Sequence, residues 1–148
     1  MRRTRFDRAH CPVARTTDLL GDWWTPIVLR ELLLGRRRFN DIQERLDISR
    51  ATLSQRLKRL EAEQVVERVQ YAEHPDRFEY RLTDKGRALW EVVVAMWQFG
   101  DDWMFAESSG AQIELIDKRT GQPIRAAMVD ATTGEPLDLA STRVRLRR

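Results

Sequence analysis

The sequence is poor in the residues that build disulfides, metal sites and catalytic centres. It contains a single cysteine, Cys11, and two histidines, His10 and His74. One cysteine excludes an intramolecular disulfide, and this set of cysteine and histidine is too small for a zinc site. A nucleophile paired with a base and a glycine-rich phosphate loop are also missing, so we expect no catalytic residue, no metal and no cofactor.

Long apolar runs are absent as well. No stretch approaches the ~20 apolar residues that a membrane helix needs, and Met1-Arg2-Arg3-Thr4-Arg5 leads into charged residues without the apolar core of a signal peptide. We therefore expect a cytoplasmic protein with no membrane partner. The chain does have 148 residues, of which 42% are hydrophobic, so it can bury a core and is not a disordered tail.

Charge is distributed unevenly along the chain, although the net charge is only +3. Residues 1–60 hold 14 Lys or Arg against 7 Asp or Glu, whereas residues 61–110 hold 5 against 11. A basic first block suits a polyphosphate such as nucleic acid, and its sign also suits acidic lipid. Charge alone does not separate these two partners.

Helical signals fill the first part of the chain. Pro12 and Gly21 bracket a short first helix, and Thr25-Pro26 starts a second helix that Gly35 ends. The apolar spacing from Phe39 to Leu46 predicts two turns of amphipathic helix.

The next helix follows after a turn of about three residues. Ser49 is a good N-cap for a helix that runs to Gln64. Its apolar face carries three leucines, Leu53, Leu57 and Leu60. Two helices joined by so short a turn are typical of a helix-turn-helix.

Residues 65–82 change from a helical to an alternating pattern. They predict two strands that flank the turn-like segment Glu73-His74-Pro75-Asp76-Arg77, and Thr83 then caps a long helix from Asp84 to about Met104. A hairpin directly after a helix-turn-helix indicates its winged form. The predicted fold is mainly α with a small β-hairpin wing (winged helix-turn-helix, α+β), plus a short C-terminal β unit.

The helix after Ser49 has the composition of a DNA recognition helix, with an apolar inner face and an outer face of small and hydrogen-bonding residues. We expect five side chains on the outer face: Ala51, Thr52, Gln55, Lys58 and Arg59. Gln55 can bond adenine, Lys58 or Arg59 can bond guanine or a phosphate, and Ser49 and Arg50 at the helix start favour a phosphate. The alternative is the solvated face of an ordinary charged helix.

Basic residues outside this helix add further candidate contacts. At the wing tip, Arg77 and His74 are placed to lie beside the sugar-phosphate backbone. Within the basic link Arg36-Arg37-Arg38 we select Arg38 as a phosphate contact. For each of them, an ordinary solvated side chain is the alternative.

From Cys11 to about Met104 the chain resembles the HxlR family of winged helix-turn-helix transcriptional regulators. The resemblance rests on an ordered set of segments: Cys11-Pro12-Val13, Leu20-Gly21-Asp22-Trp23-Trp24, Leu29-Arg30-Glu31-Leu32-Leu33-Leu34-Gly35, Arg38-Phe39-Asn40-Asp41-Ile42, Leu53-Ser54-Gln55-Arg56-Leu57-Lys58-Arg59-Leu60-Glu61 and Tyr80-Arg81-Leu82-Thr83-Asp84-Lys85-Gly86. It implies a nucleoid-associated bacterial homodimer that reads a pseudo-palindromic site in double-stranded DNA, with the first and last helices at the dimer interface.

The predicted last helix supports a partner subunit independently. It is apolar around most of its circumference, and one small domain covers only one of its sides. The expected interface residues are Leu19, Trp90, Val93, Val94, Trp97 and Met104. A tryptophan-lined pocket for a small-molecule effector is the alternative.

Cys11 is the candidate redox residue. The resemblance implies that some family members sense oxidants or electrophiles at this position, and a helix start beside Arg8, His10 and Arg15 is a setting in which reactive thiols occur. An inert cysteine buried against the dimer seam is the alternative. With no second cysteine, sensing requires an intersubunit disulfide or a small-thiol adduct.

The C-terminal part contains an internal repeat offset by thirteen residues, because residues 115–124 align with residues 128–137. Each unit is an apolar strand followed by an Asp-x-x-Thr-Gly turn. Some relatives look similar but carry Cys-x-x-Cys-Gly here, and on that comparison the ligand positions are Asp117, Thr120, Asp130 and Thr133. We expect a metal-free unit held by turn hydrogen bonds, with a hard-cation site as the alternative.

These patterns divide the chain into a basic arm (1–10), an HxlR-type winged helix-turn-helix and dimerisation domain (11–105), and a linker with a β-rich extension (106–148). We expect a homodimeric, sequence-specific DNA-binding transcriptional regulator, repressor or activator, that responds to oxidants or electrophiles through Cys11. The alternative is a ligand- or redox-binding interaction protein of the same fold without specific DNA recognition.

Overall fold

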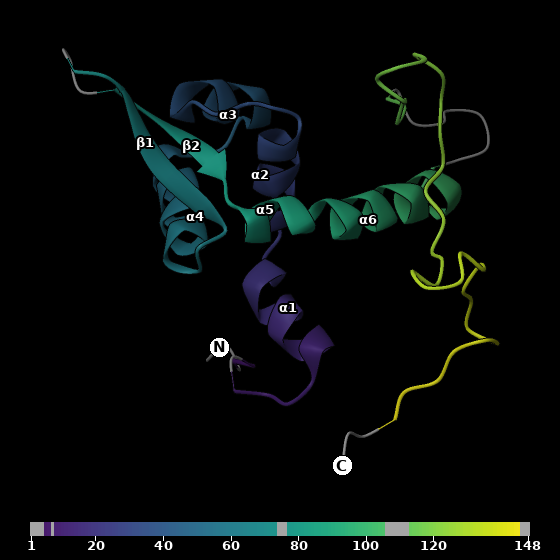
Figure 1. The fold of residues 1–148 in the computed structure, drawn as a ribbon. Coiled ribbons are helices and arrows are strands. Elements are labelled where there is room, and N and C mark those ends of the chain that lie inside the picture. Colours follow the sequence, from purple (N-terminus) through teal and green to yellow (C-terminus); the bar gives the residue numbers. More distant parts are fainter. Residues whose placement is uncertain (1–4, 7, 74–76, 106–112, 146–148) are drawn as a thin grey trace. The chain divides into compact units, whose positions relative to one another are not determined.

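The computed structural model describes residues 5–6, 8–73, 77–105 and 113–145. Its elements in chain order are α1 (Pro12–Leu20), α2 (Trp24–Leu33), α3 (Phe39–Leu46), α4 (Arg50–Ala62), β1 (Val66–Ala72), β2 (Arg77–Leu82), α5 (Asp84–Ala88) and α6 (Trp90–Trp103) (Figure 1). Contacts divide the chain into two compact units, Met1–Val93 and Val94–Arg148.

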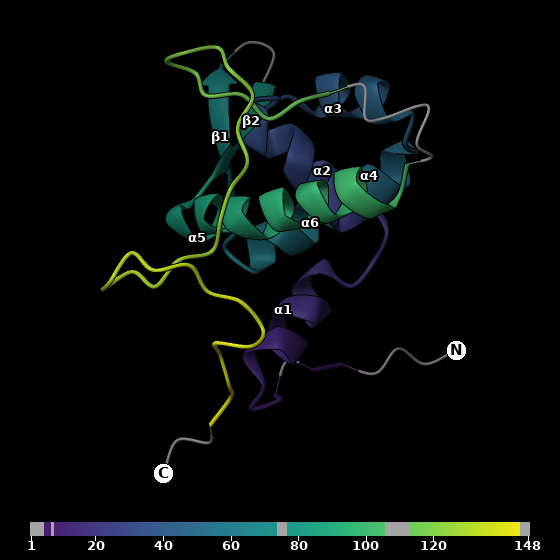
Figure 2. The same ribbon diagram turned by 90° about the vertical axis from the view of Figure 1, so that its right-hand side faces the viewer.

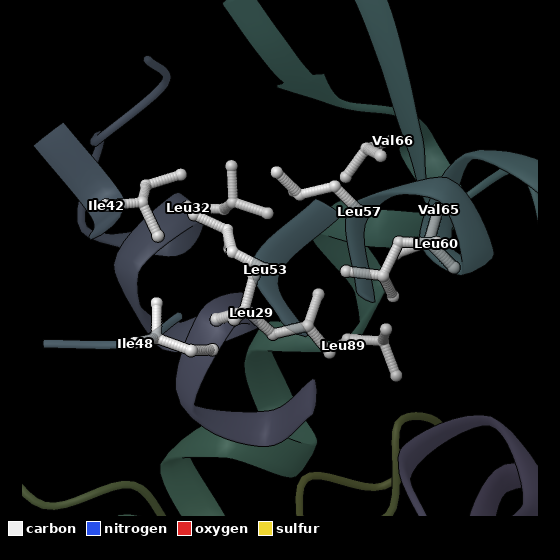
Figure 3. Packing of buried hydrophobic residues seen from close by; sticks show 11 residues of the cluster. Leu29, Leu32, Ile42, Ile48, Leu53, Leu57, Leu60, Val65, Val66 and Leu89 are labelled. Atoms are coloured by element: carbon white, nitrogen blue, oxygen red, sulfur yellow. The ribbon is translucent and has the colours of Figure 1, made fainter. Parts of the chain in front are cut away.

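The core of the first unit lies between α2, α3, α4 and the β1–β2 hairpin, which pack together in both views (Figures 1 and 2). Leucines and isoleucines at helical spacing point into it, and Leu29, Ile42 and Leu53 have no exposed surface (Figure 3). Val65 and Val66 close the core where α4 leads into the hairpin. This packing holds α4 by its apolar face and leaves the opposite face outside the core.

The turn between α3 and α4 is as short as the sequence predicts. Asp47 ends α3 in the left-handed region at φ 49°, a conformation that aspartate tolerates better than most residues. The Ser49 hydroxyl then accepts a hydrogen bond from the Thr52 backbone N–H at 3.1 Å, so the predicted N-cap of α4 is confirmed.

The wing is an antiparallel pair, β1 with β2, in which Val66 faces Leu82 and Gln70 faces Phe78. Its base is tied to the segment before α3, because the Tyr80 backbone N–H donates to the Arg37 carbonyl at 2.7 Å. The hairpin is therefore attached to the helices at its base. His74, the predicted wing-tip contact, lies outside the described residues.

The single long helix predicted from Asp84 to Met104 is wrong in one respect. Thr83 caps the start as expected, but α5 ends at Ala88 and α6 begins at Trp90. The Leu89 N–H bonds the Gly86 carbonyl three residues back at 3.2 Å, and this tighter turn interrupts the α-helical pattern. None of the helices in the described part of the chain has the length and hydropathy needed to span a bilayer.

In the second unit, the repeat forms two small hairpins of the same design. Their bridges pair Ile116 with Pro123 and Val129 with Pro136. Gly121 and Gly134 take positive φ values of 68° and 76°, which is why glycine is needed at that point of each turn. The predicted C-terminal β unit is thus present in this short form.

Side chains of the repeat close these turns. The carboxylates of Asp117 and Asp130 accept from the backbone N–H groups of Arg119 and Thr132, each at 2.7 Å. Two threonine hydroxyls accept from Gln122 and Glu135 in the same way. The side chains of Asp117, Thr120, Asp130 and Thr133 are therefore all engaged in turn hydrogen bonds.

Candidate nucleic-acid interface

The outer face of α4 offers a patch of exposed side chains with different chemistry. Ala51, Gln55 and Lys58 are exposed, as the sequence predicts, and no carboxylate lies between them on this face. The helix is anchored on its other side by Leu53, Leu57 and Leu60. The patch is thus carried by a rigid element, which favours its use in recognition.

The first turn of α4 brings together two hydroxyl groups. The Ser49 and Thr52 oxygens lie 2.7 Å apart, and Ser49 also caps the helix. Thr52 is half-buried, so less of its surface is available than the helical pattern suggests. These hydroxyls lie beside the helix start, where backbone N–H groups attract phosphate.

Two of the predicted arginine contacts are backed by aromatic rings. The Arg50 guanidinium carbon lies 5.0 Å from the Phe39 ring centroid, and that of Arg38 lies 4.9 Å from the Tyr71 ring centroid. Both arginines are exposed. Because a ring restricts the guanidinium and leaves its edge free to donate, these contacts preorganise the arginines for an anion.

The wing carries a third arginine of this kind that sequence reasoning missed. Arg68 lies over the Phe78 ring with its guanidinium carbon 3.7 Å from the centroid. Its cross-strand partner is Tyr80, whose phenol pKa is raised by burial, against a smaller lowering effect of the Arg68 charge. The diagonal spacing of residues 68 and 78 was available from the hairpin pattern. Arg77, which was predicted, is exposed at the start of β2.

Arg59 does not face outward as predicted. Its Nη2 atom donates to the Asp18 carbonyl at 2.7 Å and lies 3.2 Å from the Asp18 carboxylate, and only 25% of its side chain is exposed. Position 59 lies about as far from the apolar face as position 58 does, so the helical pattern alone does not separate the directions of Lys58 and Arg59. The nearly buried Asp18 carboxylate draws the long side chain inward because a buried charge needs a partner.

Cys11 is exposed at the N-cap of α1. The thiol is therefore not covered by its own chain, and burial against a dimer seam stays as the alternative prediction. Arg15, which was expected near the thiol, uses its Nε atom to bond the Ala9 carbonyl at 2.6 Å. The thiol is accessible to a reagent.

The predicted dimer residues differ in how much of their surface is exposed to a partner subunit. Val93 and Val94 expose only 8% and 4% of their surface, so they have little area left for an interface. Trp90 is 37% exposed and Met104 is 72% exposed, whereas Leu19 and Trp97 are intermediate. α6 also carries an exposed apolar stripe that the predicted interface did not include: Met96, Phe99 and Trp103.

Comparison with known proteins places the chain in a protein family. A model of the HxlR-like helix-turn-helix matches residues 19–108. The HTH-type transcriptional regulator Mb3122 of Mycobacterium bovis is 36% identical over 125 residues, which cover 84% of this chain and 78% of the relative. The family and these relatives are transcriptional regulators and not enzymes.

Solved structures agree with this assignment. The crystal structure of PA1607, described as a candidate transcription factor, has a TM-score of 0.86 at 38% identity and covers 96% of this chain and 99% of its own. The reduced form of the transcriptional regulator YodB from Bacillus subtilis has a TM-score of 0.55 at 37% identity, covering 63% of this chain and 93% of its own. YodB is also known in a quinone-bound form. With its winged helix-turn-helix fold, the chain belongs to the HxlR-like family of helix-turn-helix transcriptional regulators.

Proposed function

We propose that the protein is a homodimer that binds a pseudo-palindromic site in double-stranded DNA and thereby represses or activates transcription. The observation that carries this proposal is the exposed outer face of α4, with Gln55 and Lys58 on a helix anchored by three buried leucines. The second helix of a helix-turn-helix enters the major groove. There Gln55 can bond adenine bidentately, and Lys58 can reach guanine or a phosphate.

The arginines backed by aromatic rings supply the sequence-independent part of this binding. Arg38, Arg50 and Arg68 hold their guanidinium groups beside rings, and Arg77 adds an exposed charge on the wing. Contacts of this kind neutralise phosphates and fix the register of a protein on the duplex. Ser49 and Thr52 add hydroxyl donors near the start of α4.

The test is selection of genomic DNA fragments on the purified protein, followed by titration of a captured fragment at increasing salt. We expect selective capture and a steep loss of affinity with salt, since each phosphate contact releases counterions. Capture of no fragment above background, or binding that does not respond to salt, contradicts the proposal. That result favours an interaction protein without specific DNA recognition.

A second proposal concerns the effector. We infer that Cys11 responds to oxidants or electrophiles, because its thiol is exposed at the start of α1 and a family relative is known with a bound quinone. With a quinone, the sulfur forms a bond to a ring carbon and opens the adjacent C=C bond. The thiol proton passes to one ring oxygen and the hydrogen of the attacked carbon to the other, which leaves a hydroquinone adduct. With diamide, the two Cys11 thiols of a dimer lose their hydrogens to the reagent and form an intersubunit disulfide.

The effector proposal is tested on a captured DNA fragment with and without diamide or benzoquinone. We expect either reagent to change the affinity of the wild-type protein and to leave Cys11→Ser unaffected. Intact mass should show the adduct or the disulfide-linked dimer only when Cys11 is present. An equal response of the Cys11→Ser variant removes Cys11 as the sensor.

A further inference from the structure

The recognition helix α4 is held by charge as well as by its apolar face. Two arginines one turn apart on its flank reach back to the segment that contains α1 and the start of α2. Arg56 Nη1 lies 3.1 Å from an Asp22 carboxylate oxygen, and Arg59 Nη2 lies 3.2 Å from an Asp18 carboxylate oxygen. Both pairs join residues more than thirty positions apart in the sequence.

Asp18 connects three parts of the chain. It lies in α1, its side chain is only 5% exposed, and it receives Arg59 from α4. The same carboxylate accepts the Phe6 backbone N–H at 3.4 Å and lies 4.0 Å from Arg5 Nε. The Asp18 carboxylate therefore links the arm, α1 and α4.

Asp22 links the start of α2 to α4 in a similar way. One of its oxygens accepts the backbone N–H groups of Trp24 and Thr25, each at 2.9 Å, and the other bonds Arg56. The group that caps the beginning of α2 is thus also the anchor of the recognition helix.

The side chains of these two arginines bond to other parts of the protein and are largely shielded from solvent. Arg56 and Arg59 expose 18% and 25% of their side chains. The Nε atom of each is buried and has no hydrogen-bond partner among the described residues, so the bonds to Asp18 and Asp22 are what orients the guanidinium groups. Removing one member of such a pair leaves a buried charge without its partner.

We propose that the Arg59–Asp18 and Arg56–Asp22 pairs are positioning contacts that set the placement of α4 relative to α1, and that both arginines act in DNA binding through this placement and not by contacting DNA. This inference rests on the proposed function. In a dimer that reads two half-sites, the separation of the recognition helices selects the spacing of the half-sites. The two pairs are therefore determinants of spacing specificity.

The first test is a double-mutant cycle on a captured operator with Asp18→Asn, Arg59→Gln and the double variant. We expect each single change to weaken binding about tenfold, and the double variant to bind no more weakly than the weaker single one, because both remove the same ion pair. The dependence of affinity on salt should stay unchanged, since no phosphate contact is lost. The control cycle uses the exposed pair Asp84 and Arg87, for which we expect no change.

The second test separates positioning from a loss of stability. Operators with one base pair added to or removed from the spacer are titrated with the same variants. A positioning role changes the ratio of affinities for the three spacers, whereas a protein that is merely less folded loses affinity for all of them equally. If Asp18→Asn does not fold, the Asp22→Asn and Arg56→Gln cycle provides the same measurement.

Other outcomes overturn the inference. One such outcome is that the slope of log affinity against log salt concentration falls by about one in Arg59→Gln while Asp18→Asn binds normally. This result makes Arg59 a phosphate contact. Additive losses, or spacer ratios equal to those of the wild type, remove the positioning role while leaving the proposed function intact. If the wild-type protein captures no DNA fragment selectively, the proposed function fails and this inference fails with it.

Discussion

Gly86 packs against Val65 so closely that a Cβ atom at position 86 would lie 2.1 Å from the Val65 carbonyl oxygen. The neighbouring atom is backbone and cannot move aside cheaply. We expect Gly86→Ala to lower the free energy of unfolding by about 1–3 kcal/mol, as overpacking in a core does. Equilibrium unfolding in denaturant measures this change in free energy. Gly100→Ala is the matched control, since nothing lies within 4 Å of a Cβ there, and equal midpoints for the two variants would contradict the prediction.

Replacing Gln55 and replacing Lys58 should weaken DNA binding in different ways. Gln55→Ala removes a base-reading group, so we expect a loss of about 1–3 kcal/mol on the preferred operator and relaxed discrimination at one base pair. Lys58→Ala should weaken preferred and unrelated sequences alike and lower the salt slope by about one if it contacts a phosphate. Titrations on an operator and its single-base variants distinguish these results. Similar base selectivity in Gln55→Ala and wild type would remove Gln55 from the reading face.

The ring of Tyr71 should matter to DNA binding although it donates nothing to a base. It lies beneath Arg38, and an exposed cation–π contact is worth about 0.5–1 kcal/mol. We expect Tyr71→Leu to weaken binding by that amount in the presence of Arg38 and to have no effect in an Arg38→Ala background. The affinities of the wild type, the two single variants and the double variant form a double-mutant cycle. If Tyr71→Leu weakens binding equally with and without Arg38, the ring does not act through that arginine.

We propose the exposed stripe of α6 as part of the dimer surface. Phe99 is 62% exposed and lies between Met96 and Trp103 on this stripe. We expect Phe99→Glu to shift the protein from dimer to monomer in sedimentation, because a carboxylate buried without a partner is costly. The control is Leu139→Glu, at a residue that is 93% exposed in the extension. Dimers of unchanged stability in Phe99→Glu would place the interface elsewhere.

The attachment of the extension to α6 should weaken in acid or after one substitution. Arg125 bonds Asp102 and thereby lowers the pKa of that carboxyl below its ordinary value of 3.8. Because the folded-state pKa is lowered, the stabilisation is present above the ordinary value and is lost as pH falls through the lowered one. We expect Asp102→Asn to speed hydrogen exchange of the Ala126 amide, which bonds Gln98 nearby at 2.6 Å. An exchange rate that does not respond to Asp102→Asn would show that Gln98 holds the segment alone.

Local signals predicted most of the fold. The Ser49 cap, the leucine spacing of α4 and the Asp-x-x-Thr-Gly turns each depend on residues close in sequence, and the structure contains all of them. The interruption at Leu89 was not predictable in this way, because a single tighter turn leaves the apolar periodicity of the surrounding helix almost unchanged.

The candidate site was predictable only in part. Gln55 lies near the middle of the outer face, and Gln55 and Lys58 are exposed as expected. Arg59 lies about as far from the middle of that face as Lys58 does, on the other side. Its direction is decided by Asp18, forty-one residues earlier, which no local pattern reveals. On α6, apolar residues on two sides of a helix do not say which side the chain itself covers, and the structure covers Val93 and Val94 while Phe99 stays exposed.

The paired hairpins of the extension have a consequence for how this part of the protein can vary. Each turn satisfies its own backbone groups with an aspartate and a threonine from within the same thirteen residues. A unit built this way can be duplicated or deleted without leaving an unpaired polar group in its neighbour. The length of the extension can therefore change in steps of one hairpin.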